Sequence, residues 1–352
     1  MAKIKVLFSV ANDSKAMYPH LYGPNGSLDA KNSPESNDYL TDAVFQYMKS
    51  SEQFDVYECP WMVHMYKDSP SKKEELTGFG FALRKDLTQT PNILNVEETL
   101  RRISDREFDY IVMDSRTVNP WWNSRGLSPF FDDTMKIINQ VLRYYTADKI
   151  LFFDGEDQVT VLTQLVGRVC YFKRELTFDH PMIHPIGYCF PEWKFRDCLL
   201  EQKTKDMATV IPGDKSTYVF TDEDAYYGDY RSSRFAMTWK KLGWDCFRHH
   251  EILFSSCVPV FPDIEDCPRQ TLTHYPKDIC IEVMRSGVVV PRYRKWQQYH
   301  DLYCFLDVSV DFSKISKDQY SDILGRLKEH SLKHLTSRKM TEYILSRAES
   351  MA

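Results

Sequence analysis

The chain has 352 residues, of which 43% are hydrophobic and 14% aromatic, and its formal net charge is -5. This composition excludes a disordered chain, and the length suits two domains better than a single core. The negative charge gives no general attraction to nucleic acid or anionic membranes, so we expect no nucleic-acid partner. Any phosphate-binding site must therefore be local.

The pattern of cysteines and the hydropathy of the chain indicate the cellular compartment in which the protein works. Nine cysteines are scattered along the sequence without a Cys-x-x-Cys pair, a pattern typical of reduced thiols and not of a disulfide framework or a zinc site. The apolar run at 4–10 is short and is interpreted as a strand, not as a signal peptide. No run approaches the roughly 18 apolar residues of a membrane span. We expect a cytoplasmic protein with no membrane span.

The first half alternates short apolar runs with amphipathic segments. These runs predict strands at 4–10, 54–59, 110–114, 150–153 and 169–172, and helices at 38–50 and 134–145. Nearly continuous apolar strands are typical of a parallel sheet that is buried on both faces. Three strands are followed by polar loops that contain Asp13, Asp114 and Asp154. Ligands of open α/β sheets bind beyond the carboxyl ends of strands, so these loops should line a cleft.

The second half repeats this alternation after a proline-rich connection at 181–193. We predict strands at 208–211, 218–220, 258–261, 279–283 and 303–306, and helices at 226–242, 246–256, 318–332 and 336–347. The expected fold class is α/β, with two Rossmann-like domains. We place the first domain at 1–190 and the second at 191–335. We expect a C-terminal helix at 336–352 that packs back towards the first domain.

The segment 243–263 contains the most informative pattern. Asp245 stands at the expected N-cap of a helix that carries Arg248 and Glu251 three residues apart on one face. An arginine near a helix N-terminus suits a phosphate, and a glutamate three residues later can accept two ribose hydroxyls. The alternative is an ordinary ion pair on a solvated helix face.

This segment also resembles a known family. Gly243-Trp-Asp-Cys-Phe-Arg-His-His-Glu-Ile-Leu253, followed by Cys-Val-Pro-Val-Phe, is similar to the donor-site segment of exostosin-like glycosyltransferases of the GT-B type. Many members read Lys-x-x-Gly-Trp-Asp-Cys-x-Arg-His-Tyr-Glu-Ile there, and this chain has His250 in place of the tyrosine. Weaker matches in the same order extend the resemblance over roughly 38–300. It implies two domains facing each other across a cleft, with the nucleotide sugar on the second domain.

Transfer from a nucleotide sugar needs cations for the leaving diphosphate and a base for the acceptor hydroxyl. Besides Arg248 and Glu251, the donor-binding candidates are His249, Lys240, Lys241, Asp245, Arg231, Arg234 and Thr221. Each lysine and arginine outside the motif could equally be part of a solvated helix face, and a lone histidine is usually structural.

The first domain should supply the catalytic base. Asp13 is the first choice, because inverting GT-B enzymes often place their base after the first strand, and Asp114, Asp154 and Glu156 are rivals. Asp222-Glu-Asp224 has the shape of a metal-binding Asp-x-Asp, but we interpret it as a turn or a ribose contact. We therefore expect no metal and no cofactor other than the co-substrate.

These observations together predict an inverting, metal-independent glycosyltransferase. The resemblance implies a UDP-sugar as the donor, with UDP-xylose among the candidates, and a glycan as the acceptor. The alternatives are a glycan- or nucleotide-binding protein of the same shape without transfer activity, or a sugar-nucleotide epimerase.

Overall fold

The computed structural model describes residues 2–10, 38–69, 83–118, 131–296 and 303–352. The chain divides into two compact units. The first comprises Met1–Arg174, Asp179–Pro185 and Met340–Ala352, and the second comprises Glu175–Phe178 and Ile186–Lys339.

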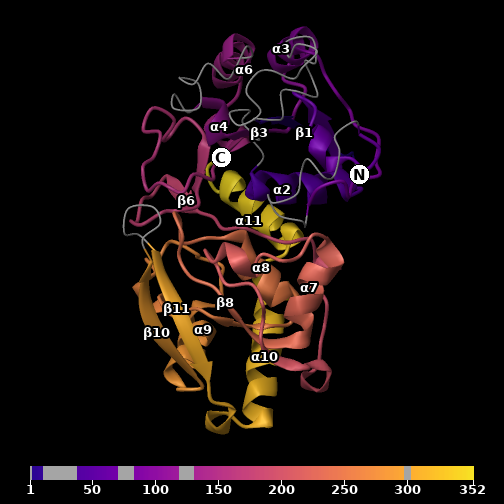
Figure 1. Cartoon of the computed structure of the whole chain (residues 1–352). Helices are drawn as coiled ribbons and strands as arrows, with labels where there is room; N and C mark the ends of the chain where they lie inside the picture. The colour runs from indigo at the N-terminus through magenta and orange to yellow at the C-terminus, as the bar shows by residue number, and fades with distance from the viewer. Residues whose placement is uncertain (1, 11–37, 70–82, 119–130, 297–302) are drawn as a thin grey trace. The chain divides into compact units, whose positions relative to one another are not determined.

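The first unit is built on a parallel six-stranded sheet with the order β2-β1-β3-β4-β5-β6 (Figure 1). Its strands are β1 (Ile4–Ser9), β2 (Phe54–Glu58), β3 (Tyr110–Asp114), β4 (Ile150–Asp154), β5 (Cys170–Lys173) and β6 (Ile183–Pro185). The prediction of a parallel sheet in this half is confirmed. Because β1 lies between β2 and β3, the chain order reverses there, which is where open α/β sheets usually bind ligands.

Helices accompany this sheet. They are α2 (Tyr39–Ser50), α3 (Val96–Ser104), α4 (Ser115–Val118), α6 (Phe131–Tyr144) and α11 (Ser337–Glu349), whose last ten residues belong to this unit. Helix α2 begins where Asp38 accepts a hydrogen bond from the Leu40 amide at 3.1 Å. In α11, Tyr343 packs against Phe172 of β5 at a ring distance of 6.2 Å, and its hydroxyl donates to the Pro185 carbonyl. The end of the chain is thereby fixed to the first sheet.

The second unit contains a smaller parallel sheet with the order β7-β8-β9 and a separate antiparallel pair, β10-β11. These strands are β7 (Lys205–Met207), β8 (Ser233–Met237), β9 (Val258–Val260), β10 (Val289–Trp296) and β11 (Tyr303–Val310). The helices are α7 (Glu223–Ser232), α8 (Phe247–Phe254), α9 (Lys277–Arg285) and α10 (Lys317–His334). The α/β class is therefore confirmed for both units.

The predicted helix at 226–242 is wrong. Helix α7 ends at Ser232, and the next five residues form β8 between β7 and β9. Phe235, Ala236 and Met237 are all buried in that sheet, and a short apolar run buried on both faces suits a central strand. Lys240 and Lys241 therefore follow a strand and do not end a helix.

Three predicted strands of the second half are also wrong. Residues 279–283 lie in α9, where Cys280 and Val283 are buried at a helical spacing of three. Residues 208–211 follow β7, and 218–220 lie in an irregular segment before α7. Local alternation of apolar residues could not separate these cases, because the pairing partners are distant in sequence.

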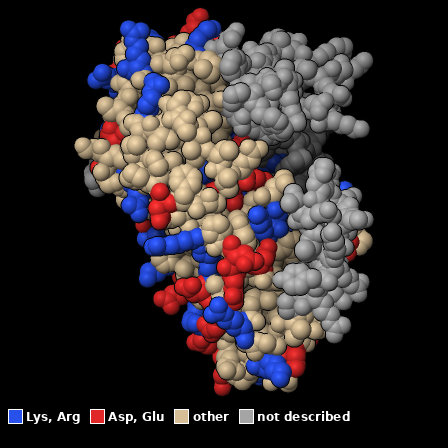
Figure 2. Space-filling model, turned by 90° about the vertical axis from the view of Figure 1, so that its left-hand side faces the viewer, with Lys and Arg blue, Asp and Glu red and all other residues tan. Residues whose placement is uncertain are grey.

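The described surface carries mixed charge. On the face shown in Figure 2, acidic and basic side chains are interspersed and do not form large patches of one sign. None of the helices in the described part of the chain is both long enough and apolar enough to span a bilayer.

Candidate functional site

The carboxyl edge of the β7-β8-β9 sheet gathers the central residues of the sequence motif. Strand β8 leads through residues 238–246 into α8, which returns the chain to β9. In such a βαβ unit the helix begins at the carboxyl edge of the sheet. Arg248 in the first turn of α8, Lys240 and Lys241 after β8, and Asp263 after β9 therefore belong to one edge.

Arg248 is the most unusual of these residues. Its guanidinium lies 5.5 Å from the ring centre of Tyr218, and Nη2 is 3.5 Å from the Tyr218 hydroxyl. The residue is partly exposed, yet Nε and Nη1 are buried and have no hydrogen-bond partner among the described residues. Unsatisfied buried donors on a cation are costly, so a site that keeps them is suited to an anionic ligand.

Tyr218 lies next to this cation. Its hydroxyl accepts a hydrogen bond from the Gly213 amide at 2.9 Å. Burial alone would raise the pKa of the Tyr218 phenol, but the charges of Arg248 and Lys241 outweigh burial and lower it. Two cations therefore act on this phenol, although the whole chain is acidic. Sequence patterns alone do not single out Tyr218.

Glu251 lies one turn further along α8 and is buried. Its two carboxylate oxygens accept hydrogen bonds from Tyr226 at 2.7 Å and Tyr227 at 3.1 Å, both from α7. Burial raises the pKa of Glu251, and the hydrogen bond from Tyr226 opposes that rise. Each carboxylate oxygen can accept more than one hydrogen bond, so the arrangement leaves capacity for a ligand hydroxyl.

Asp245 does not cap α8, which corrects the sequence interpretation. The N-cap is Cys246, whose side chain makes no capping hydrogen bond. Asp245 instead accepts from the Tyr188 amide at 2.7 Å and contacts His250 Nε2 at 3.0 Å. Glu175 accepts from the amides of Trp244 and Asp245, both at 2.9 Å. Asp245 and Glu175 therefore fix the loop that leads into α8.

His249 is fully buried inside the second unit. One ring nitrogen lies 2.5 Å from Thr238 Oγ1 and the other 2.8 Å from the Trp244 carbonyl. Burial lowers the pKa of His249 to about 3, so the ring is neutral near pH 7. Both ring nitrogens of His249 therefore already contact protein groups.

The remaining donor candidates are spread over the unit. Lys240 is exposed, with its ammonium 5.2 Å from the Trp244 ring centre. Arg231 ends α7 and Arg234 lies near the start of β8, paired with Asp206 at 3.2 Å. Both arginines therefore lie towards the amino edge of the sheet, away from the first turn of α8. Thr221 is exposed just before α7.

Asp222-Glu-Asp224 forms the start of α7. Asp222 is the N-cap and accepts from the Ala225 amide at 2.8 Å, and Glu223 pairs with Lys194 at 2.6 Å. Within the described ranges, no group of three or more His, Cys, Asp or Glu side chains is arranged to hold a metal ion.

Asp263 is a candidate that the sequence interpretation missed. Its Oδ2 accepts from the Lys240 amide at 3.1 Å, whereas Oδ1 is buried without a hydrogen-bond partner in the described structure. Burial raises the pKa of Asp263 to about 6. Its position directly after the apolar run of β9 could have identified it, because polar residues at strand ends often face ligands.

In the first unit, Asp154 ends β4 and is almost fully buried. It accepts from Tyr171 at 2.5 Å and pairs with Lys173 at 2.8 Å. Asp114 ends β3, where it accepts from the Thr117 amide at 3.1 Å and so caps α4. Asp13 lies outside the described residues. Asp114 and Asp154 thus both lie at the carboxyl edge of the first sheet.

The same edge holds a pair that the sequence did not reveal. His64 Nε2 lies 2.8 Å from Asp42 Oδ1, and both side chains are buried. His64 Nδ1 has no hydrogen-bond partner among the described residues. Asp42 lies in the first turn of α2 and His64 follows β2, so no local motif joins them.

Close packing also marks this edge. A Cβ added to Gly155, the residue after β4, would lie 1.8 Å from Asp38 Oδ2. A side chain at residue 155 would therefore require the Asp38 side chain, which caps α2, to move.

Comparisons with protein-family models, with curated proteins and with solved structures found no match.

Proposed function

We propose that the protein is a glycosyltransferase of the GT-B type that uses a UDP-sugar, with UDP-xylose among the candidate donors, and a glycan acceptor. The single observation that supports this most strongly is Arg248. It brings two buried, unpartnered nitrogens to the first turn of α8 at the carboxyl edge of a parallel sheet. Backbone amides at a helix N-terminus and an arginine fork are together suited to a diphosphate.

In this proposal Arg248 takes up negative charge as the sugar–phosphate bond breaks, with Lys240 and Lys241 near the same edge. Preorganised cations of this kind stabilise a departing diphosphate without a metal ion. Glu251, held by Tyr226 and Tyr227, accepts the ribose hydroxyls. Asp245 and His249 act by holding the loop that aims α8.

The base belongs to the first unit, and Asp13 remains our first choice. Asp114 accepts a hydrogen bond from the Thr117 amide in α4, and Asp154 forms an ion pair with Lys173. An Asn at either position would disturb these contacts, so it would report on both stability and catalysis. The Asp42–His64 pair is a further candidate, because a carboxylate that orients an imidazole is a common arrangement for general bases.

The test is release of UDP from a panel of UDP-sugars, with and without a glycan acceptor and in excess EDTA. Asp13→Asn should lower turnover by about 10²–10⁴-fold and leave UDP affinity unchanged. Asp114→Asn, Asp154→Asn and His64→Gln belong in the same assay, each with a thermal melt. Full activity in Asp13→Asn together with loss in one folded rival would move the assignment to that rival.

A second candidate function is a nucleotide- or glycan-binding protein without transfer activity. It is favoured because Asp114 and Asp154 already bind protein groups, so fewer carboxylates are available for catalysis. UDP binding without UDP release from any sugar in the panel would select it.

A further inference from the structure

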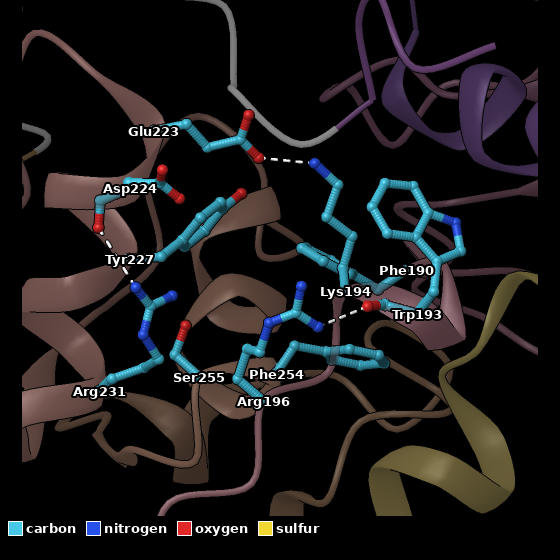
Figure 3. Close-up of a pocket in the computed structure, with 10 residues that line it drawn as sticks. All are labelled: Phe190, Trp193, Lys194, Arg196, Glu223, Asp224, Tyr227, Arg231, Phe254 and Ser255. Atoms are coloured by element: carbon cyan, nitrogen blue, oxygen red, sulfur yellow. Dashed lines mark hydrogen bonds and ion pairs between the residues drawn. The ribbon is translucent and has the colours of Figure 1, made fainter. Parts of the chain in front are cut away.

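A second cavity in the same unit lies outside the proposed donor site. It has a volume of about 170 Å³, well above the roughly 10–15 Å³ that one water molecule needs. Its walls come from residues 190–196, one face of α7 and the end of α8 (Figure 3). Arg248 does not line it. A site of this size can hold a ligand of many atoms.

Among the described residues, three basic and two acidic side chains line the walls. Lys194 is neutralised by Glu223 at 2.6 Å. Arg196 donates to the carbonyls of Trp193 at 2.6 Å and Phe195 at 3.1 Å, and Arg231 to the carbonyl of Asp224 at 3.3 Å. In the part of the chain that the structure describes, neither arginine forms an ion pair with a carboxylate. Both guanidinium charges therefore remain available to an anion.

The donors around the cavity come from different directions. Figure 3 shows the guanidinium groups of Arg196 and Arg231 in the lower part of the view and the Lys194 ammonium above them, beside Glu223. Several separated donors suit a tetrahedral oxyanion, and arginine forks suit phosphate oxygens in particular. The carboxylate of Asp224 also lines the cavity and leaves a net excess of one positive charge among these five groups. That carboxylate would repel an anion but accept hydroxyl groups.

Trp193 adds an apolar platform. Its side chain is 48% exposed, and the Lys194 ammonium lies 4.7 Å from its ring centre. An exposed aromatic ring is suited to packing against a sugar ring, and Figure 3 shows Asp224, whose carboxylate can accept hydroxyl groups, on the other side of the pocket. The cavity therefore combines groups for a phosphate with groups for a polyhydroxylated body.

We infer that this cavity is a phosphate-binding site, occupied by free phosphate or by the phosphate group of a sugar phosphate. The inference does not depend on the proposed transferase activity, because the two sites use different arginines. Their walls are nevertheless connected, since Tyr227 lines the cavity and its hydroxyl donates to Glu251.

Calorimetric titration with inorganic phosphate, at ionic strength held constant with chloride, tests the inference. We expect saturable binding that Arg231→Gln weakens about 10- to 100-fold, the effect of losing a charge-assisted hydrogen bond. Arg196→Gln should weaken it similarly. Arg231 makes one long backbone contact, so its variant should fold even if Arg196→Gln does not, and thermal melts check both. Arg285→Gln is the matched control, because Arg285 is exposed and paired with Glu265 at 2.8 Å.

Two further arms distinguish the source of the phosphate. If glucose 1-phosphate binds more tightly than phosphate and Trp193→Ala loses this gain, the ligand is a sugar phosphate. If the two bind equally tightly, the ligand is free phosphate. Glucose that binds as tightly as glucose 1-phosphate would overturn the inference. So would the absence of phosphate binding, or phosphate binding that is lost in Arg248→Ala and kept in Arg231→Gln.

Discussion

Lys173 in the first unit and Arg248 in the second are both cations taken largely out of water, but their surroundings differ. Lys173 is fully buried and pairs at 2.8 Å with Asp154, which also accepts from Tyr171. Arg248 has two buried nitrogens without partners and no carboxylate ion pair among the described residues. Folding alone explains the arrangement around Lys173. Around Arg248 the contact with Tyr218 offsets only part of the cost, because two buried donors have no partner among the described residues.

This difference teaches how to separate structural from functional polar residues in the chain. A buried charge that is paired and hydrogen-bonded maintains the fold, and removing one partner is expensive. A buried charge without a partner lowers stability and is retained where a ligand supplies the missing contacts. By this criterion Arg248 is the strongest site candidate, Asp263 follows through its one unpartnered oxygen, Oδ1, and Asp154 is weaker.

We expect the largest change in stability from replacing Lys173, the cation that is paired. Lys173→Met should lower the free energy of unfolding by about 3–5 kcal/mol, because Asp154 would keep a buried charge without its partner. Urea titration of the variant measures this change. Lys328→Met is the control, since Lys328 pairs with Asp197 at the surface, where an ion pair contributes about 0–1 kcal/mol. Equal costs for the two variants would contradict the structural role of Lys173.

We expect a smaller change in stability from the protonation of Asp263 as the pH varies. Its pKa rises from an ordinary value near 4 to about 6 in the folded chain. The folded state therefore holds this proton more tightly, and stability should fall as pH rises from about 4 to 6, by at most about 3 kcal/mol. Asp263→Asn should remove that contribution.

Chemical unfolding of wild type and Asp263→Asn at several pH values between 4 and 7 measures the difference. The variant should be more stable relative to wild type at pH 7 than at pH 4. A constant difference over this range would show that Asp263 has an ordinary pKa.

The smallest change is expected in the stability of the unpaired cation. Arg248→Met removes a cation–π contact with Tyr218 but also removes two unsatisfied buried donors. These effects oppose each other, so the free energy of unfolding should change by less than about 1 kcal/mol in either direction. A loss of 3 kcal/mol or more in urea titration would make Arg248 structural, like Lys173, and end the contrast between them.

The sequence predicted five strands of the first sheet, because they are short apolar runs bounded by polar residues. It missed β6, which lies in the segment 181–193 that we interpreted as a connection. Residues 110–114 and 150–153 lie where β3 and β4 are found. The second unit was harder, because β8 continues directly from α7 and the pattern at 279–283 fits strand and helix alike. In such segments only tertiary pairing decides the structure.

The candidate site was predictable where residues are close in sequence and unpredictable where they are not. The spacing of Arg248 and Glu251 indicated a shared site on one helix. Glu251 accepts hydrogen bonds from the hydroxyls of Tyr226 and Tyr227. His64 contacts Asp42, and the guanidinium of Arg248 lies over the ring of Tyr218. None of these contacts follows from local spacing, because the fold alone brings the segments together.

Calorimetric titration with UDP tests the central claim, that Arg248 binds the diphosphate of a nucleotide donor. Wild type should bind UDP, and Arg248→Ala should bind it more weakly by about 1.5–3 kcal/mol, the value of a charge-assisted hydrogen bond. Arg285→Ala, which removes a surface arginine of the same unit, should leave the affinity unchanged. If Arg248→Ala binds UDP as tightly as wild type and Arg285→Ala do, or if wild type binds none, the proposed donor site is contradicted.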